Sequence, residues 1–213
     1  MKWLYGDSWD KYPIEEGELW RESHGSILSV CDIFNGLPDY MYHADMIYSD
    51  PPWNTGNLTS FFTKAEKSNT HNFNDLANKI FSFVRAMKEK TCYLEIGYQN
   101  LDIYLKEMQS IFPFVQYWQI KYYKKYPCYL VRGGISNIAI DYSGMDDSET
   151  PFVAMRLEEC KSVADMCMGR GLTALAAYDN NKLFYGTELN KRRLAVAIDR
   201  ICQRGEVFTH EIR

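Results

Sequence analysis

The sequence lacks the cysteine spacing that holds a metal and the apolar length that crosses a membrane. Its six cysteines are scattered, with no C-x-x-C pair and no cysteine–histidine cluster at zinc-ligand spacing, so we expect reduced thiols and no metal site. The N-terminal stretch MKWLYGDSWD contains no apolar signal core, and no later run is long enough for a membrane span. These absences favour a cytoplasmic protein without a membrane partner.

The sequence also lacks internal repeats, low-complexity tracts and linkers rich in Pro, Gly or Ser. We therefore expect residues 1–213 to form a single domain, since this length suffices for one sizeable core. A net charge of −4 and a pI of about 5.6 argue against a protein that coats nucleic acid. A local basic stripe stays open, and the 15% of aromatic residues suit a core as well as base stacking.

Short apolar runs alternate with segments of helical periodicity. Residues 114–132, rich in aromatic and β-branched side chains, predict two antiparallel strands that turn near Lys124–Pro127. The other predicted strands cover 27–31, 46–49, 92–96, 162–165 and 183–186. Helices are predicted from Asn74, Asn100 and Asn190, each as a capping residue, and from Leu172. This alternation predicts an α/β domain with a seven-stranded, mostly parallel sheet, helices on both faces and an antiparallel strand near one edge.

The tetrad Asp50-Pro51-Pro52-Trp53 directly follows the predicted strand 46–49. An Asp-Pro pair alone is a common turn, but four such residues where open α/β sheets bind ligands favour a functional interpretation. The exocyclic amine of a base is a poor nucleophile because its lone pair is delocalised into the ring. A carboxylate and a proline-held backbone carbonyl that accept its two N–H groups aim that lone pair at an incoming methyl group, and the aromatic residue can stack on the extruded base. The tetrad is therefore predicted to be catalytic.

A strand, a glycine-bearing turn and the start of a helix follow one another over residues 163–173. Gly169 and Gly171 allow the backbone to approach a ligand closely. Glu188 ends the next predicted strand, where an acid is well placed to accept both hydroxyls of a ribose. Together these features predict a site for an adenosyl cofactor.

On these motifs the chain resembles the amino-methyltransferases that act on DNA, whose catalytic motif is [DNS]-P-P-[YFW]. It is similar, over roughly residues 26–202, to their circularly permuted β group, in which that motif precedes the cofactor loop. The resemblance implies a Rossmann-like class I fold, S-adenosylmethionine as cofactor, DNA as substrate and a prokaryotic or phage-infected host cell. It implies adenine N6 as the target, because Asp in the first motif position goes mainly with adenine. The cofactor-binding residues that it implies are Asp32, Asp165, Cys167, Gly169, Gly171, Thr173 and Glu188.

The hairpin and the segment after it bear on target recognition. By the same resemblance, Tyr122, Tyr123 and Tyr126 fall where such enzymes supply a second aromatic wall for the base. The interleaved Lys121, Lys124 and Lys125 are either a solvated hairpin tip or contacts to phosphates and bases. Residues 133–150 are predicted to be an irregular loop and a much-shortened target-recognition segment. We therefore expect a relaxed target sequence, or a homodimer or partner subunit that supplies the missing surface.

Two further segments carry expectations of their own. Residues 54–73 are polar and are predicted to be a mobile loop that closes over substrate. Lys191-Arg192-Arg193 is predicted to be solvated surface. Three alternatives to an adenine-N6 DNA methyltransferase remain: N4-cytosine methylation of DNA, N6-adenine methylation of RNA, and a non-catalytic methyltransferase-like subunit that binds nucleic acid.

Overall fold

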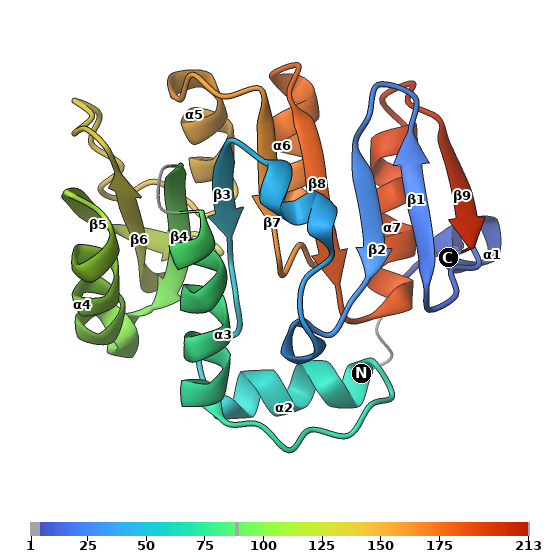
Figure 1. Cartoon of the computed structure of the whole chain (residues 1–213), viewed down its shortest axis with the longest axis horizontal. Helices are drawn as coiled ribbons and strands as arrows, with labels where there is room; N and C mark the ends of the chain where they lie inside the picture. The colour runs from blue at the N-terminus through green and yellow to red at the C-terminus, as the bar shows by residue number, and fades with distance from the viewer. Residues whose placement is uncertain (1–4, 88–89, 213) are drawn as a thin grey trace.

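The computed structural model describes residues 5–87 and 90–212, in which strands and helices alternate (Figure 1). The strands are β1 (Glu18–Glu22), β2 (Ile27–Val30), β3 (Met46–Ser49), β4 (Thr91–Gly97), β5 (Phe114–Tyr122), β6 (Tyr126–Gly134), β7 (Ser162–Asp165), β8 (Leu183–Glu188) and β9 (Phe208–Ile212). The α-helices are α1 (Ser8–Lys11), α2 (Thr55–Lys64), α3 (Phe73–Ala86), α4 (Leu101–Ile111), α5 (Thr150–Leu157), α6 (Leu172–Asp179) and α7 (Lys191–Cys202). Short 3-10 helices cover Ile33–Asn35, Asp39–His43 and Tyr98–Asn100.

The described strands form one sheet in the order β5-β6-β4-β3-β7-β8-β2-β1-β9. Its centre, from β4 to β2, is parallel, whereas the pairs at both edges are antiparallel. The predicted α/β architecture is thus confirmed for the parallel centre of a mixed sheet. The sheet has nine strands and the prediction of seven is wrong, and antiparallel pairs lie at both edges, not at one. The two missed strands, β1 and β9, are short and carry charged residues, so they show no continuous apolar run. They form because Trp20 of β1 pairs with Leu28 on one side and His210 on the other.

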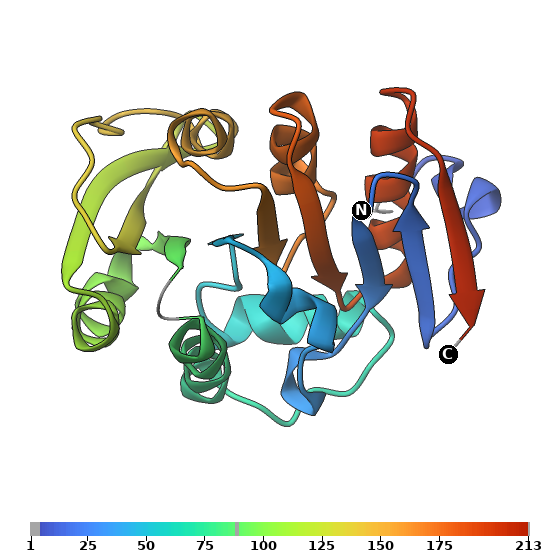
Figure 2. The same ribbon diagram turned by 45° about the horizontal axis from the view of Figure 1, so that its top comes forward.

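Alternate residues of the central strands face two separate cores. In β4, Leu94 and Ile96 pack with α2, α3 and α4, whereas Tyr93 packs on the opposite side with α5, α6 and α7. Figure 2 shows these two groups of helices on the two faces of the sheet. Because both faces are covered, the parallel strands are apolar at successive positions, which is why they were visible in the sequence.

The helix starts differ from the predictions at two of three capping residues. Asn72, not Asn74, caps α3, and its reciprocal partner is the side chain of Asp75. Asn100 precedes α4 but makes no capping bond; its side chain donates instead to the carbonyl of Trp53. Asn190 caps α7 as predicted, by accepting from the backbone N–H groups of the first turn.

The two segments predicted to be irregular have different outcomes. Residues 54–73 are not a simple loop, because Asn54 caps helix α2 over the first half of the segment. Of the predicted irregular loop 133–150, residues 133–134 belong to β6 and Thr150 begins α5. Residues 135–149 contain no helix or strand beyond an isolated bridge from Lys121 to Asp146, as predicted. This segment lies against β5, since the N–H of Asp147 donates to the carbonyl of Lys121 at 2.8 Å.

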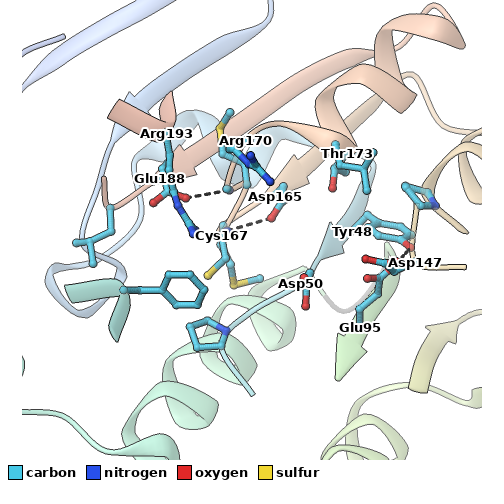
Figure 3. A pocket seen from close by; sticks show the side chains of 18 of the residues that line it. Tyr48, Asp50, Glu95, Asp147, Asp165, Cys167, Arg170, Thr173, Glu188 and Arg193 are labelled. Atoms are coloured by element: carbon cyan, nitrogen blue, oxygen red, sulfur yellow. Dashed lines mark hydrogen bonds between the residues drawn. The ribbon is translucent and has the colours of Figure 1, made fainter. Parts of the chain in front are cut away.

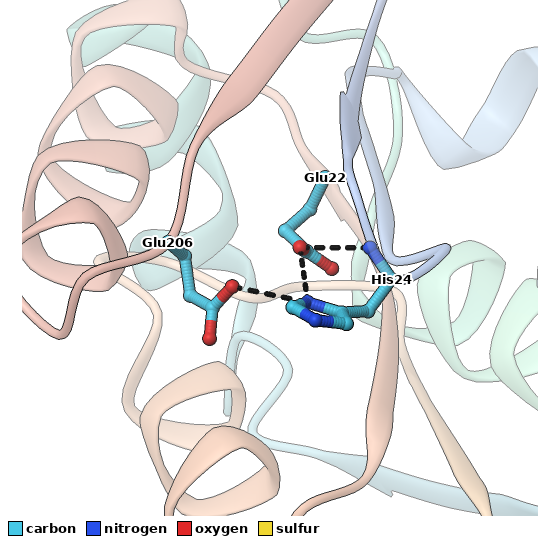
Figure 4. Close-up of side chains that lie close together, drawn as sticks. All are labelled: Glu22, His24 and Glu206. Atoms are coloured by element: carbon cyan, nitrogen blue, oxygen red, sulfur yellow. Dashed lines mark hydrogen bonds and ion pairs between the residues drawn. The ribbon is translucent and has the colours of Figure 1, made fainter.

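A histidine and two glutamates link the β1–β2 turn to the segment before β9 (Figure 4). His24 Nδ1 lies 2.7 Å from Glu22 Oε1 and 3.3 Å from Glu206 Oε2. Hydrogen bonding to Glu22 raises the pKa of His24, which favours a protonated imidazole between the two carboxylates. Glu22 and His24 directly precede β2 in the chain, so the cluster lies at the amino end of the parallel strands.

Within the described ranges, no helix has the length and apolar character needed to span a bilayer.

Gly171 begins helix α6 in a left-handed conformation with φ of 78°. A Cβ there would lie 2.9 Å from the Cβ of Ala197 on α7, so the glycine allows two helices to approach closely. Gly144 has φ of 79° but nothing within 4 Å of such a Cβ, which makes it a matched control. We expect Gly144→Ala to cost about 1–2 kcal/mol for the backbone alone, and Gly171→Ala to cost about 1–3 kcal/mol more because of overpacking. Urea unfolding measures both; equal losses would show that helix packing does not require Gly171.

Candidate functional site

A cavity of about 570 Å³ opens at the carboxyl ends of the central parallel strands. The backbone ladder between β3 and β7 ends at Ile47 and Ala164, one or two residues before the strands themselves end. Beyond that point the side chains of Ser49 and Asp165 connect the strands, with Ser49 Oγ donating to Asp165 Oδ1 at 2.7 Å. From β3 the chain leads to β4 on one side of this gap, and from β7 it leads to β8 on the other side. Open α/β sheets bind ligands at such a point, where successive connections run in opposite directions.

The cavity has two halves (Figure 3). The loop half is lined by Asp32 after β2, by the turn from Asp165 to Arg170, and by Glu188 at the end of β8. The acidic half is lined by Asp50 after β3, Glu95 of β4, Tyr122 of β5, and Asp146 and Asp147 before α5. Helix α2 closes one side with Leu58, Phe61 and Phe62. The segment predicted to be a loop over the substrate is thus a helical wall of this cavity.

Backbone N–H groups hold the carboxylate of Glu188 in the loop half. Its Oε2 accepts from the N–H of Gly169 at 2.8 Å and its Oε1 from that of Asn190 at 2.9 Å. Each oxygen keeps a further lone pair for a ligand hydroxyl. Burial raises the pKa of Glu188 to about 7 against the lowering effect of Arg193 and these N–H groups. Burial likewise raises the pKa of Asp165 to about 6, although Ser49 and the N–H of Cys167 donate to it.

An arginine on α7 was missed as a site residue. The guanidinium of Arg193 lies 4.5 Å from the centre of the Phe61 ring, and both residues line the cavity. Its charge lowers the pKa of Asp50 and of Glu188 against the effect of burial. The prediction that Lys191-Arg192-Arg193 is solvated surface is therefore wrong for Arg193. The available signal in the sequence was the position of Arg193. It lies in the first turn of a helix that follows directly after Glu188, and this helix start lies at the ligand-binding edge of the sheet.

Asp50 projects into the acidic half from the end of β3. Its side chain is exposed to the cavity while protein atoms surround it, and this enclosure raises its pKa to about 7. The nearby charges of Asp165 and Asp147 act in the same direction, whereas a hydrogen bond from Trp53 opposes it. Trp53 Nε1 donates to Asp50 Oδ1 at 2.9 Å, which leaves Oδ2 toward the cavity for another donor.

Three neighbours hold Trp53 in place. Its ring lies edge-on to Tyr122 with centroids 4.7 Å apart, and its backbone carbonyl accepts from Asn100 Nδ2 at 2.5 Å. A Cβ on Gly97 would lie 2.8 Å from the Cβ of Trp53, so glycine is required for this approach. Trp53 itself does not line the cavity, whereas Tyr122 does. The indole therefore orients Asp50 and supports Tyr122 from behind.

Glu95 is the second functional residue that sequence reasoning missed. It lies within the largely apolar strand β4, and only 3% of its surface is exposed. Glu95 Oε1 accepts from Tyr48 Oη at 2.5 Å and from Thr150 Oγ1 at 2.6 Å. A charged residue type inside a buried strand was the available signal, because such residues are seldom buried without a partner or a function.

The structure brings most of the predicted site residues together and leaves some outside. The predicted residues that line the cavity are Asp32, Asp50, Pro52, Tyr122, Tyr123, Lys124, Asp165, Cys167, Gly169, Thr173 and Glu188. Those outside its lining are Pro51, Trp53, Lys121, Lys125, Tyr126 and Gly171. Tyr126 and Lys125 are exposed at the hairpin tip, where the ammonium of Lys125 lies 5.1 Å from the Tyr126 ring. Gly171 serves helix packing instead of lining the cavity.

Solved structures share this fold, although no family model and no curated protein matches the sequence. M1.HpyAVI in complex with SAM is 12% identical, with a TM-score of 0.56 over 81% of this chain and 98% of its own. TTHA0409 of Thermus thermophilus, a candidate DNA modification methylase complexed with S-adenosyl-L-methionine, is 15% identical, with a TM-score of 0.57 over 83% and 93%. The cytosine-N4-specific PvuII DNA methyltransferase is 12% identical, with a TM-score of 0.51 over 80% and 84%. At these identities the likeness confirms the fold class: the chain has the α/β fold of the DNA methyltransferases.

The raised pKa values of the buried Asp165 and Glu188 predict a pH dependence of stability. Their values of about 6 and 7 exceed the ordinary values near 4 of an unfolded chain. The folded protein therefore binds more protons than the unfolded chain between these limits, so stability decreases as pH rises through 4 to 7. We expect the Tm to be higher at about pH 5.5 than at about pH 8. The Glu188→Gln variant should reduce that difference, and the exposed Glu159→Gln should leave it unchanged; a Tm that rises with pH would contradict the site electrostatics.

Proposed function

We propose that this chain is an S-adenosylmethionine-dependent methyltransferase that methylates the exocyclic N6 of adenine in DNA. The observation that carries the proposal is a shared cavity whose loop half suits an adenosyl cofactor and whose acidic half presents Asp50. The fold shared with DNA methyltransferases supports it.

The loop half fits the cofactor by the chemistry of its donors and acceptors. Glu188 has free lone pairs toward the two ribose hydroxyls, and Asp32 follows β2 on the side where the adenine would lie. Arg170 and Arg193 supply positive charge at the cavity for the carboxylate of the amino-acid part. Thr173 and Gly169 line the space between them. The cofactor, when bound, supplies an electron-poor methyl group on a positively charged sulfur.

The acidic half would orient the nitrogen that accepts this methyl group. Asp50 Oδ2 would accept one N–H of the amine, and Tyr122 would stack on the base. The carbonyl of Pro51 is the predicted acceptor of the other N–H, although Pro51 lies outside the cavity lining. The lone pair of the nitrogen would then point at the methyl group that the bound cofactor supplies, and Asp50 or water would accept the proton that the nitrogen loses. The protein contributes alignment and exclusion of water, because the sulfonium already supplies the leaving group.

Adenine is the proposed base because Asp precedes the prolines of the motif. N4 of cytosine is the second candidate, and the likeness to the cytosine-N4-specific PvuII enzyme supports it. The same amine chemistry would serve an adenine in RNA. A non-catalytic subunit is disfavoured, because such a domain needs neither Asp50 nor Glu188.

Target recognition is proposed to need additional surface. Residues 135–149 lie against β5, and their backbone bonds to Gln119 and Lys121 keep them from entering a groove. Lys121, Lys124 and Lys125 lie on or beside the hairpin turn, where phosphates of an extruded nucleotide would pass. We propose either a relaxed target sequence or a second subunit that completes the reading of the DNA. This protein would act in the cytoplasm of a prokaryotic or phage-infected cell.

Two variants are expected to separate the two halves of the cavity. Asp50→Ala should lower turnover by at least about 100-fold, because the amine loses its acceptor, while the Kd for S-adenosylmethionine stays within about threefold. Glu188→Ala should weaken cofactor binding about 10-fold or more, since charge-assisted hydrogen bonds contribute about 1.5–3 kcal/mol.

Calorimetry measures the cofactor Kd, and transfer of an isotope-labelled methyl group to DNA measures turnover. Digestion of that DNA to nucleosides and mass spectrometry identify the modified base. Labelled adenine with the parent protein and none with Asp50→Ala is the expected result. Equal activity of parent and variant, or label only on another atom, would contradict the proposal.

A further inference from the structure

Glu95 is a carboxylic acid that the proposed methyl transfer does not use. It reaches the acidic half from β4, beside Asp50 and Asp147 (Figure 3). Both hydroxyl groups around it, those of Tyr48 and Thr150, contact the same oxygen, Oε1. No described residue forms a hydrogen bond with Oε2. Because Oε2 is not among the solvent-inaccessible oxygens that lack a hydrogen bond, it is accessible, and it faces the cavity that Glu95 lines.

Burial and the crowding of acids in this half favour the uncharged form of Glu95. Asp50, Glu95, Asp146 and Asp147 line the same space, with Lys124 as the cation beside them. Burial first, and then the charge of Asp50, raise the pKa of Glu95 well above its ordinary value, although the hydroxyls of Thr150 and Tyr48 lower it. The charge of Asp147 adds to the rise. Because like charges repel, ionisation of Asp50 favours the protonated form of Glu95.

The hydroxyls around Glu95 bear on which of its oxygens carries the proton. In a carboxylic acid the carbonyl oxygen accepts hydrogen bonds and the other oxygen carries the proton. Tyr48 and Thr150 place their hydroxyls at Oε1, and Tyr48 Oη also lies 2.8 Å from Thr150 Oγ1. When both hydroxyls donate to Oε1, the proton of the acid is on Oε2, which faces the cavity. The acidic half thus presents an acceptor on Asp50 and a donor on Glu95 side by side.

We propose that Glu95 donates a hydrogen bond from Oε2 to the ring nitrogen next to the target amine and so determines which bases are accepted. The inference rests on the proposed function. Adenine presents an amine at N6 beside an unprotonated N1, and cytosine presents an amine at N4 beside an unprotonated N3. Guanine and thymine present the opposite pair at this edge, a carbonyl oxygen beside a ring N–H. Those bases would set carbonyl oxygen against Asp50 and N–H against the proton of Glu95.

Base analogues test this role. The substrates are two single-stranded oligonucleotides, identical except that one carries 1-deazaadenine, in which a C–H group replaces N1 and the N6 amine is kept. For the parent protein, kcat/KM should be at least about 10-fold higher with adenine than with 1-deazaadenine. A difference in the intrinsic reactivity of the two bases would affect every variant alike, and this factor is counted separately. Glu95→Met, which removes the donor at similar size, should lose that extra preference. Glu95→Gln, whose amide still donates, should keep it.

Two controls make the result specific. Asp147→Asn removes a charge from the same half without removing the donor, so its preference should equal that of the parent protein. Binding of both oligonucleotides in the presence of S-adenosylhomocysteine, measured by fluorescence anisotropy, gives the same ratio without turnover. Calorimetry with S-adenosylmethionine verifies that each variant is folded.

The outcomes separate this inference from the proposed function. If the parent protein methylates no base, the proposed function is contradicted. The ratio of the affinities for the adenine and 1-deazaadenine oligonucleotides would still test the role of Glu95. Glu95→Met with the same ratio as the parent protein would overturn the inference. So would loss of the preference in Glu95→Gln, a result that decides the question even if Glu95→Met does not fold.

Discussion

The hydrogen bond from Ser49 to Asp165 joins the two halves of the cavity. It connects the ends of β3 and β7 where their backbone ladder has stopped, and both residues are buried. Ser49 immediately precedes Asp50, and Asp165 also accepts from the N–H of Cys167 in the glycine loop. One carboxylate therefore fixes the proposed acceptor of the target amine relative to the proposed cofactor loop. Methyl transfer needs this relation to hold within a fraction of an ångström, which a buried charge-assisted bond supplies better than a loop contact.

The distribution of charge separates what enters the cavity from what stays outside it. Four carboxyl groups line the acidic half, whereas Lys124 lines its rim and Lys121 and Lys125 lie at the adjoining hairpin. In the proposed function, an uncharged base would enter such a space, whereas a phosphate would be repelled from it and attracted to the lysines. A protein with a net charge of −4 can thus contact nucleic acid through a small basic edge, without an overall basic surface.

The sequence predicted the parts of this structure that depend on local pattern. Buried parallel strands such as β3 and β7 are continuous apolar runs, and their ends locate Asp50, Asp165 and Glu188. Strands β1 and β9 were not predicted, because they are short, contain charged residues and depend on pairing with neighbouring strands. Arg193 and Glu95 were not predicted as site residues, because only the fold shows that their side chains line the cavity. Trp53 was expected to stack on a base, yet its N–H donates to Asp50 and it lies outside the cavity lining, whereas Tyr122 lines the cavity and is the proposed aromatic wall. This placement of Trp53 depends on its contacts with Gly97 and Asn100.

Binding of one molecule that spans both halves tests the central claim most directly. A suitable probe joins the 5′ carbon of the cofactor's adenosyl group through a short linker to N6 of a second adenosine. If the two halves form one reaction site, calorimetry should give one probe per chain and a Kd at least about 10-fold below that of S-adenosylhomocysteine, because the second contact becomes intramolecular. The advantage should disappear in Asp50→Asn. A probe that binds no better than S-adenosylhomocysteine, or that is indifferent to Asp50, would contradict the claim.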